Sequence, residues 1–350
     1  MLFSIIIPVY NSESYLYDSI NSAVCQNTKN KFSYEVIVVD DCSTDDSINI
    51  AKTFSSRKNY YILSTGKNSG PGIARNVGFD RSSGKYILFL DSDDYLDVNA
   101  LSKLYNTLVL DGFNSDLIAY NWKYLTNKKL KDNDSDGGRR DIDSLLSKEG
   151  DLVNNYLSMK MDGSVIYTLI KRSVITENNI RFCCGYHEDI DYIFKLYYFS
   201  NGIIYMSDRI YYKRRLNSSI TGHITKKHIV GYIRAWKEIF DFICIEASHK
   251  KLINEYIVNF RSGLTGAIAI LVIAISKLNC KNPVYLFHLL YKQYINNFVN
   301  NETYVKYIQP LPNITYYDKV SVCFIKIMES SDKDLVETKV LKCIEQHNRR

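Results

Sequence analysis

Three aspartates follow an apolar run in the segment KYILFLDSDDYLD, residues 85–97. Asp91, Asp93 and Asp94 are separated only by Ser92, and carboxylates this close repel one another unless a positive charge balances them. Mg²⁺ and Mn²⁺ favour oxygen ligands and bind phosphates at the same time. The cluster is therefore a candidate site for a divalent cation that offsets the charge of a leaving diphosphate.

The cluster is also compatible with two different roles. A phosphatase nucleophile also follows a strand in a D-x-D pattern, but there it follows the first strand, and a Thr or Val stands where this chain has Asp94 and Tyr95. Alternatively, Asp93 or Asp94 is structural and caps the helix that begins before Leu101. D-x-D patterns are common, so the rest of the chain has to distinguish the three roles.

Apolar runs of strand length alternate with helical patterns through the first part of the chain. The runs cover residues 3–9, 34–41, 60–65 and 85–90, and the helical patterns cover residues 12–26, 43–56 and 70–82. Unbroken runs of Val, Ile and Leu between helices indicate a parallel sheet that is covered on both faces. Ligands of such sheets bind beyond the carboxyl ends of the strands, so one rim should carry the site.

Each of the first three runs brings its own polar residues to that rim. Pro8 to Asn11 end the first run, Asp40 and Asp41 end the second, and Ser64 to Asn68 end the third. A carboxylate there can accept hydrogen bonds from a nucleobase or a ribose, and Arg75 at a helix start suits an anionic ligand. The sequence contains neither G-x-G-x-x-G nor a P-loop pattern, which argues against dinucleotide redox chemistry and P-loop chemistry.

Four segments resemble, in order and at the usual spacing, the signatures of the family 2 glycosyltransferases. They are SIIIPVYNSESYL, EVIVVDDCSTDDS, NSGPGIARNVG and GKYILFLDSDDYL, which together span about the first 100 residues. The resemblance implies the GT-A fold, an α/β nucleotide-sugar-binding fold with a mostly parallel, Rossmann-like sheet and helices on both faces. It also implies a nucleotide-sugar donor, most often a UDP-sugar, and a Mn²⁺ or Mg²⁺ ion.

The resemblance assigns roles to residues along the rim. Pro8, Tyr10 and Asp41 would surround the base, Asp91 would reach the ribose, and Arg75 would lie near the nucleotide. Asp93 would be the metal ligand, with Asp91 beside it. The set expected to bind the donor is Pro8, Tyr10, Asn11, Glu13, Asp40, Asp41, Asn68, Arg75, Asp91, Ser92, Asp93 and Arg215.

The candidate catalytic base lies in a separate segment. Family members usually invert the anomeric carbon, which requires one base to take a proton from the acceptor hydroxyl. The segment GYHEDIDYIFKLYYFS, residues 185–200, resembles the E-D motif of the family at the head of a helix. By that resemblance Asp189 is the base and Glu188 supports it. A purely structural alternative is that these acids stabilise the first turn of the helix.

A further segment, IYYKRRLNSSITGH, resembles the stretch that closes the catalytic domain in many relatives. Arg214 or Arg215 would meet the diphosphate. His223 would be a third metal ligand, as imidazole is in some relatives, although a solvated loop histidine explains it nearly as well.

Composition and charge limit the partners and the cellular compartment that the sequence allows. The net charge of +6 suits an anionic substrate or membrane face, although a solvated basic surface explains it at least as well. The basic residues are not interleaved with aromatics as in a nucleic-acid groove. Eight cysteines without C-x-x-C spacing indicate reduced thiols in a cytoplasmic protein.

The apolar segment 263–276 has a core of about 13 residues, shorter than the roughly 20 that span a bilayer, so a buried helix is favoured over an in-plane membrane contact.

The predicted organisation is a catalytic domain over residues 1–222 and a helical C-terminal region over residues 223–350. In the catalytic domain, residues 1–98 would bind the nucleotide-sugar and residues 99–222 the acceptor, with a polar loop at residues 126–143. The C-terminal region would hold the acceptor or dock on the cytoplasmic face of the inner membrane. The sequence leaves open whether the protein forms oligomers.

The predicted function is an inverting, metal-dependent transfer of a sugar to a hydroxyl of a bacterial surface glycan, such as a capsule or a lipooligosaccharide. The acceptor would be a glycan or a lipid-linked glycan. A non-catalytic sugar-nucleotide-binding protein of the same fold is one alternative, but it would lack the D-x-D or E-D acids. A nucleotidyltransferase is another, but it would carry a glycine-rich, basic loop in place of PVYNSESY after the first strand.

Overall fold

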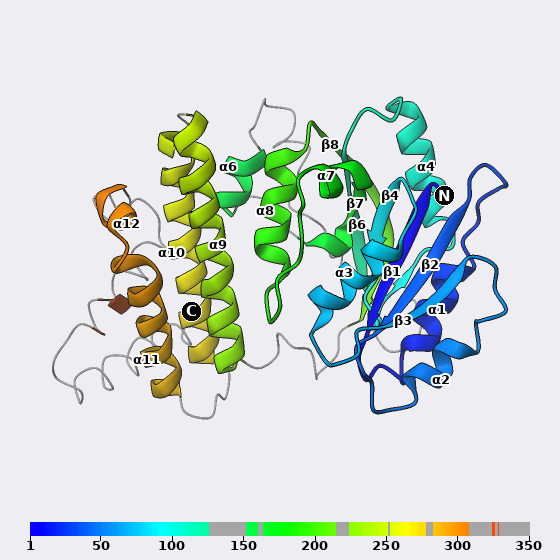
Figure 1. The fold of residues 1–350 in the computed structure, drawn as a ribbon, viewed down its shortest axis with the longest axis horizontal. Helices are drawn as coiled ribbons and strands as arrows, with labels where there is room; N and C mark the ends of the chain where they lie inside the picture. Colours follow the sequence, from blue (N-terminus) through cyan, green and yellow to red (C-terminus); the bar gives the residue numbers. More distant parts are fainter. Residues whose placement is uncertain are drawn as a thin grey trace. The chain divides into compact units, whose positions relative to one another are not determined.

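The computed structural model describes residues 1–125, 152–159, 164–214, 224–250, 253–277, 283–307, 324–325 and 328 (Figure 1). The chain divides into unit 1, made of Met1–Lys148 and Asp162–Leu216, and unit 2, made of Glu149–Met161 and Asn217–Arg350. Arg215, His223, the polar loop at 126–143 and the expected boundary after residue 222 lie outside the described residues. The roles expected for the two domains stay predictions.

Unit 1 contains a sheet of eight strands in the order β3-β2-β1-β4-β7-β6-β8-β5. The strands are β1 (Phe3–Val9), β2 (Tyr34–Asp40), β3 (Tyr60–Ser64), β4 (Tyr86–Phe89), β5 (Tyr95–Leu96), β6 (Leu117–Leu125), β7 (Thr168–Lys171) and β8 (Ile203–Arg214). β1 to β4 are mutually parallel, as the alternating pattern predicts. β7 runs antiparallel to β4 and β6, and β5 runs antiparallel to β8, so the complete sheet is mixed.

Helices cover both faces of this sheet. They are α1 (Leu16–Val24), α2 (Ser47–Lys52), α3 (Pro71–Arg81), α4 (Ala100–Leu110), α7 (Arg172–Glu177) and α8 (Asp189–Phe199), with a 3₁₀ turn at Val165–Tyr167. α1, α2 and α4 lie on one side of the sheet, and α3 and α8 lie on the other (Figure 1). Every residue of β1 is buried, which explains why this strand has an apolar run without polar alternation.

Two details of the helices matter for the site. α3 packs so closely on the sheet that a Cβ at Gly78 would collide with the side chain of Ile6. α2 begins at Ser47, four residues later than the pattern from residue 43 predicts, because residues 43–46 are held in a loop by the residues that follow β1. The second detail ties the loop after β2 to the segment that follows β1.

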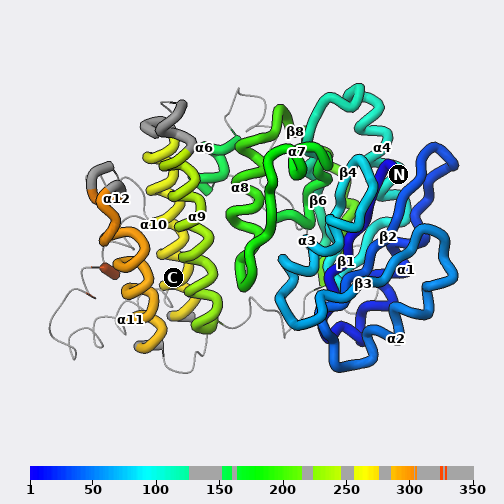
Figure 2. The backbone as a smooth tube through the Cα atoms, in the orientation of Figure 1, coloured from blue at the N-terminus to red at the C-terminus, as the bar shows by residue number. Residues whose placement is uncertain are grey.

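Unit 2 is helical in its described residues. It contains α6 (Leu152–Leu157), α9 (Lys226–Lys250), α10 (Ile253–Lys277), α11 (Pro283–Tyr294), a π-helical turn at Ile295–Val299 and α12 (Glu302–Tyr307). α9, α10 and α11 pack against one another, and each of the three contacts the other two (Figure 2). Gly263 allows α10 to approach α6 and α9, because a Cβ there would collide with Leu157 O and the ring of Trp236.

α10 is longer than the apolar segment recognised in the sequence. Its stretch Tyr256–Ile275 has 20 residues and a mean hydropathy of 1.8, which by length and composition alone is enough to cross a membrane. However, 61% of its most apolar window is buried inside the protein, and Phe260, Leu264 and Ala267 are fully buried. The burial agrees with the favoured prediction of a core helix.

Candidate active site

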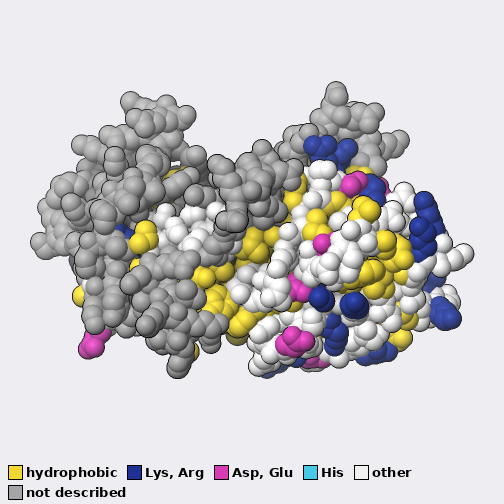
Figure 3. Space-filling view, turned by 90° about the horizontal axis from the view of Figure 1, so that it is seen from above, with side chains coloured by type: hydrophobic (Ala, Val, Ile, Leu, Met, Phe, Trp, Pro, Cys, Tyr) yellow, Lys and Arg dark blue, Asp and Glu magenta, His cyan; other side chains and the backbone are white. Residues whose placement is uncertain are grey.

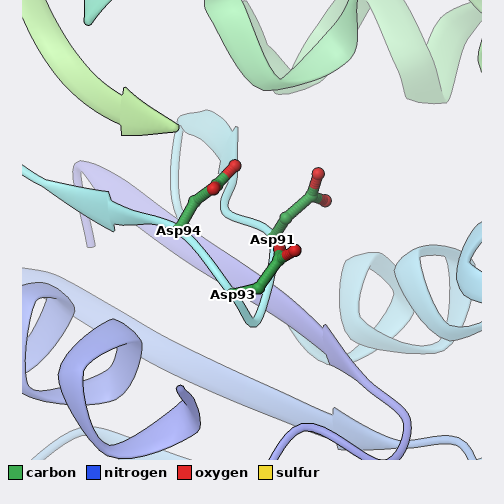
Figure 4. Close-up of side chains that lie close together, drawn as sticks. All are labelled: Asp91, Asp93 and Asp94. Carbon is green, nitrogen blue, oxygen red and sulfur yellow. The ribbon is translucent and has the colours of Figure 1, made fainter. Parts of the chain in front are cut away.

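The acidic cluster occupies the loop between β4 and β5. One carboxylate oxygen from each of Asp91, Asp93 and Asp94 lies within 4.8 Å of the other two. In Figure 4 the side chains of Asp91 and Asp93 point to the same side of the loop. Two half-buried carboxylates that face one space form an all-oxygen donor set, which suits Mg²⁺ or Mn²⁺.

Asp94 is the structural member of the cluster. Its side chain is buried; one oxygen accepts a hydrogen bond from Tyr211 Oη (2.8 Å) and the other from Arg214 N (2.8 Å). Burial and repulsion from Asp93 and Asp91 raise the pKa of Asp94 well above its usual range. Helix capping is the wrong explanation of this cluster, because the N-cap residue of α4 is Asn99.

Asp93 is half-buried beside Asp91 and lies near Lys213 and Arg214. Burial, together with repulsion from Asp91, raises the pKa of Asp93 to about 6, although Lys213 and Arg214 oppose the rise. Arg214 also fixes the loop, since its Nε donates to Asp93 O (2.8 Å) and its Nη2 pairs with Asp18 (2.7 Å). These contacts already engage Arg214, one of the two arginines expected at the diphosphate.

Arg75 lies between Asp91 of the D-x-D cluster, which we call the donor side, and Glu188 of the E-D motif, which we call the acceptor side. Its Nη2 is 2.9 Å from Asp91 Oδ1, and its Nη1 is 2.6 Å from Glu188 Oε1. Only 6% of the residue is exposed. Burial opposes the charged form, but the three acids Asp91, Glu188 and Asp189 raise the pKa of Arg75 further above its ordinary value. Arg75 therefore stays charged and joins two segments that are far apart in the chain.

Asp189 is the first residue of α8 and is half-buried. Burial and repulsion from Glu188 raise the pKa of Asp189 to about 7, and the charge of Arg75 partly offsets this rise. Glu188 precedes it as the N-cap residue and is itself 8% exposed. The fold thus brings the D-x-D and E-D acids to the same arginine, with one acid titrating near neutral pH.

Asp41 holds a loop together. Its two oxygens accept hydrogen bonds from Ser69 N (2.8 and 3.1 Å), Gly70 N (2.7 Å) and Thr65 Oγ1 (2.6 Å). All three partners belong to the loop between β3 and α3. Asp41 is only 2% exposed, so the observed role of its side chain is to shape this loop.

Asn11 and Glu13 shape the neighbouring loop in the same way. Asn11 Oδ1 accepts from Thr44 N (2.8 Å), and Glu13 Oε2 accepts from Asp46 N (2.9 Å). Asp40 contributes from the end of β2, where its Oδ1 accepts from Ser43 N (3.2 Å). Three residues expected to bind the nucleotide thus have observed contacts to the backbone of residues 43–46.

The remaining donor-side residues divide by exposure. Tyr10 is 48% exposed and Asn68 is exposed, so both side chains are accessible at the rim. Pro8 is buried within β1, where it is in register with Val39. Ser92 lies 2.7 Å from Ser12, hydroxyl to hydroxyl, which ties the acidic loop to the segment after β1.

Two residues of the site were not named from the sequence, although both lie in segments that resemble family signatures. Tyr211 lies in β8 and reaches Asp94 across the sheet, and Asn76 in α3 binds the backbone of Phe182. Neither stands next to an acid in the sequence. Their roles depend on tertiary contacts, which a motif search in the sequence does not detect.

Comparison with known proteins identifies the fold and the family. The model of the family described as Glycosyl transferase family 2 matches residues 4–154. The match covers 151 of the 350 residues, and over this part the chain is similar to the family 2 glycosyltransferases. Its fold is similar to a crystal structure of Staphylococcus aureus TarS residues 1–349 in complex with UDP-GlcNAc, with a TM-score of 0.63, 23% identity, and coverage of 94% of this chain and 90% of that one. These findings confirm the expected GT-A fold.

Two curated relatives of this glycosyltransferase domain are bacterial. The poly(ribitol-phosphate) beta-N-acetylglucosaminyltransferase TarS of Staphylococcus aureus is 31% identical over 215 residues, which are 61% of this chain and 35% of that protein. A poly(ribitol-phosphate) beta-glucosyltransferase of Bacillus spizizenii is 35% identical over 189 residues, which are 52% of this chain and 27% of that protein. The chain thus spans about a third of the length of these relatives.

Proposed function

We propose that this chain transfers a sugar from a UDP-sugar to a hydroxyl of an acceptor, with inversion at the anomeric carbon. The observation that carries the proposal is the meeting of two acid pairs at Arg75, which contacts Asp91 at 2.9 Å and Glu188 at 2.6 Å. The family of the domain supports the reaction class. A structural neighbour in complex with UDP-GlcNAc supports the choice of UDP.

On the donor side, Asp91 and Asp93 would hold Mn²⁺ or Mg²⁺. When bound, the ion supplies positive charge that stabilises the leaving diphosphate. Tyr10 and Asn68, which are exposed at the rim, would contact the nucleoside, and Asp41 would set the loop that carries Asn68. His223 and Arg215 lie outside the described residues, and their expected roles at metal and diphosphate stay predictions.

On the acceptor side, Asp189 would take the proton of the attacking hydroxyl. A base works best when its pKa lies near the working pH, and the pKa of Asp189 is raised to about 7. Glu188 would stay paired with Arg75, which leaves Asp189 as the acid of this motif that receives the proton. The proton then stays on the Asp189 carboxylate while the sugar forms a bond with the acceptor oxygen and UDP leaves.

The acceptor we favour is a polyol-phosphate polymer of a bacterial cell surface, rather than a capsule or a lipooligosaccharide. Both curated relatives described above are named as poly(ribitol-phosphate) glycosyltransferases. The net charge of +6 is compatible with a polyanionic acceptor. Figure 3 shows Lys and Arg side chains in several groups on the face of unit 1 that is seen from above, with Asp and Glu beside some of them. We place the reaction in the cytoplasm, where UDP-sugars are made.

The rate of transfer should depend on the ionisation of Asp189. The base must be deprotonated, and its pKa is about 7, so kcat should fall about tenfold per pH unit below pH 7 and level off above it. A pH profile of kcat between pH 5.5 and 9, at saturating donor and acceptor, checks this expectation. A kcat that stays constant down to pH 5.5 would exclude a base with this pKa.

A donor and acceptor screen tests the proposed function itself. The chain is incubated with Mn²⁺, one of several UDP-, GDP-, CMP- or dTDP-sugars, and synthetic poly(ribitol phosphate), and sugar incorporation is compared with nucleotide release. We expect incorporation with one UDP-sugar and little with the other nucleotides. Nucleotide-sugar binding without transfer to this or any other surface-glycan acceptor would favour a non-catalytic binding protein of the same fold.

A further inference from the structure

One face of α3 is built around the segment that leads to the catalytic base. Gly72, Arg75 and Asn76 occupy positions i, i+3 and i+4 of the helix and therefore share a face. Each of them meets the segment Phe182–Glu188, which ends immediately before Asp189. We call this segment the acceptor-side loop and the three α3 residues the platform.

Asn76 binds the start of the acceptor-side loop. Its Nδ2 donates to Phe182 O (2.9 Å), and Phe182 N donates to Asn76 Oδ1 (3.1 Å). This reciprocal pair uses both polar atoms of the amide and both polar atoms of one backbone residue. The Phe182 ring then stacks on Tyr192 of α8, with centroids 3.7 Å apart. Asn76 thus fixes the backbone at the point where the loop begins.

Gly72 lies close to both ends of the loop, and Arg75 pairs with its last residue, Glu188. A Cβ at Gly72 would lie 2.7 Å from Glu188 Cγ and 2.8 Å from Cys183 O, so only glycine allows this approach without a shift. Arg75 lies on the next turn, where one nitrogen pairs with Glu188 and the other with Asp91. Its guanidinium also lies 5.5 Å from the ring centroid of Phe182.

We propose that the platform of Gly72, Arg75 and Asn76 positions the acceptor-side loop, and that Asn76 is a positioning residue for the base Asp189. This proposal rests on the proposed function, since it assigns a role in that reaction. Arg75 completes the arrangement by fixing the separation between Asp91 on the donor side and Glu188 on the acceptor side. Arg75 links these two acids in the structure, and the expectation that it lies near the nucleotide stays a prediction.

The test is the variant Asn76→Ala, which removes both hydrogen bonds to Phe182. A misplacement of about 1 Å can reduce a rate by 10²-fold, so we expect kcat to fall at least about tenfold. The Kd of the UDP-sugar in Mn²⁺, measured by calorimetry, should change by less than about twofold, because the donor-side loops are untouched. Asn114→Ala is the matched control: it removes one amide-to-carbonyl bond, to Asp111 O (2.7 Å), outside the platform and the acceptor-side loop, and should leave both values unchanged.

Hydrogen exchange tests the positioning without any transfer reaction. The amides of Phe182 to Glu188 should exchange faster in Asn76→Ala than in the wild-type chain, whereas the amides of β1 should not. If the wild-type chain transfers no sugar, the proposed function fails, and the exchange data still decide whether the platform holds the loop. Unchanged exchange in the loop would overturn the proposal.

Two further variants keep the proposal testable if Asn76→Ala does not fold. Asn76→Asp retains an acceptor for Phe182 N and loses the donor to Phe182 O, so its kcat should lie between those of the wild type and Asn76→Ala. Gly72→Ala keeps every polar group and pushes on Glu188, and it should lower kcat more than donor affinity. Unchanged kcat, or equal losses of kcat and donor affinity, would contradict a positioning role.

Discussion

Replacing Asp189 with Asn should reduce kcat by about 10²–10⁴-fold, the usual contribution of a general base. The amide has nearly the same shape as the carboxylate but cannot accept the proton of the acceptor hydroxyl. Because Asp189 is placed on the acceptor side, the affinity for the UDP-sugar should change little. The substitution also removes a charge that repels Glu188, so the stability of the variant should not fall.

The measurement is a steady-state assay of transfer paired with calorimetry of donor binding in Mn²⁺. Asp208→Asn is a matched control, since it makes the same change at an exposed acid that pairs with Lys103 (3.2 Å) on the surface of unit 1. The control should keep its full kcat. If Asp189→Asn keeps the wild-type kcat, Asp189 is not the base. If its donor affinity falls as much as its kcat, Asp189 acts on the donor and not on the acceptor.

Replacing Asp93 with Ala should abolish the part of donor affinity that depends on the metal. Asp93 and Asp91 face the same space, and one carboxylate alone binds a divalent cation weakly. We expect the Kd of the UDP-sugar in Mn²⁺ to rise about 10- to 100-fold, or roughly 1.4–2.8 kcal/mol. In EDTA the variant and the wild-type chain should bind the donor equally.

Calorimetry with Mn²⁺ and with EDTA separates the metal-dependent part of the donor affinity from the part that does not need the metal. Asp46→Ala is the control: this exposed acid lies beside the site in the loop before α2, and its observed side-chain contact is to Asn49 (2.7 Å). Its metal-dependent affinity should match that of the wild type. If Asp93→Ala keeps the same difference between Mn²⁺ and EDTA, Asp93 is not a metal ligand.

The sequence predicted well those parts of the fold whose signal is local. Alternation of buried runs with helical patterns predicted β1 to β4 and their parallel order, because a covered parallel strand is apolar at every position. Pro71 predicted the first position of α3 because proline lacks a backbone N–H, and the N–H groups of the first helical turn have no partner within the helix. The four motifs also predicted the family that the comparison identifies.

The sequence did not predict features that depend on contacts between distant segments. The direction of β7 depends on how the chain returns to the sheet, and the apolar run of Thr168–Lys171 is compatible with either direction. The carboxylate of Asp41 has the same residue type as a nucleotide ligand, but it satisfies backbone N–H groups of its own loop. Residue type therefore indicated the rim, whereas the hydrogen bonds within its loops are visible only in the tertiary structure, and the role of Asp41 at the base stays a prediction.

The most direct test of inverting transfer by a single base is the anomeric configuration of the product. The chain is incubated with Mn²⁺, the UDP-sugar selected by the screen and its acceptor, and the new anomeric proton is observed by NMR as it forms. A single displacement assisted by Asp189 predicts that an α-linked UDP-sugar gives a β-linked product at first formation, with no signal in Asp189→Asn. An α-linked product would contradict inversion by a single base.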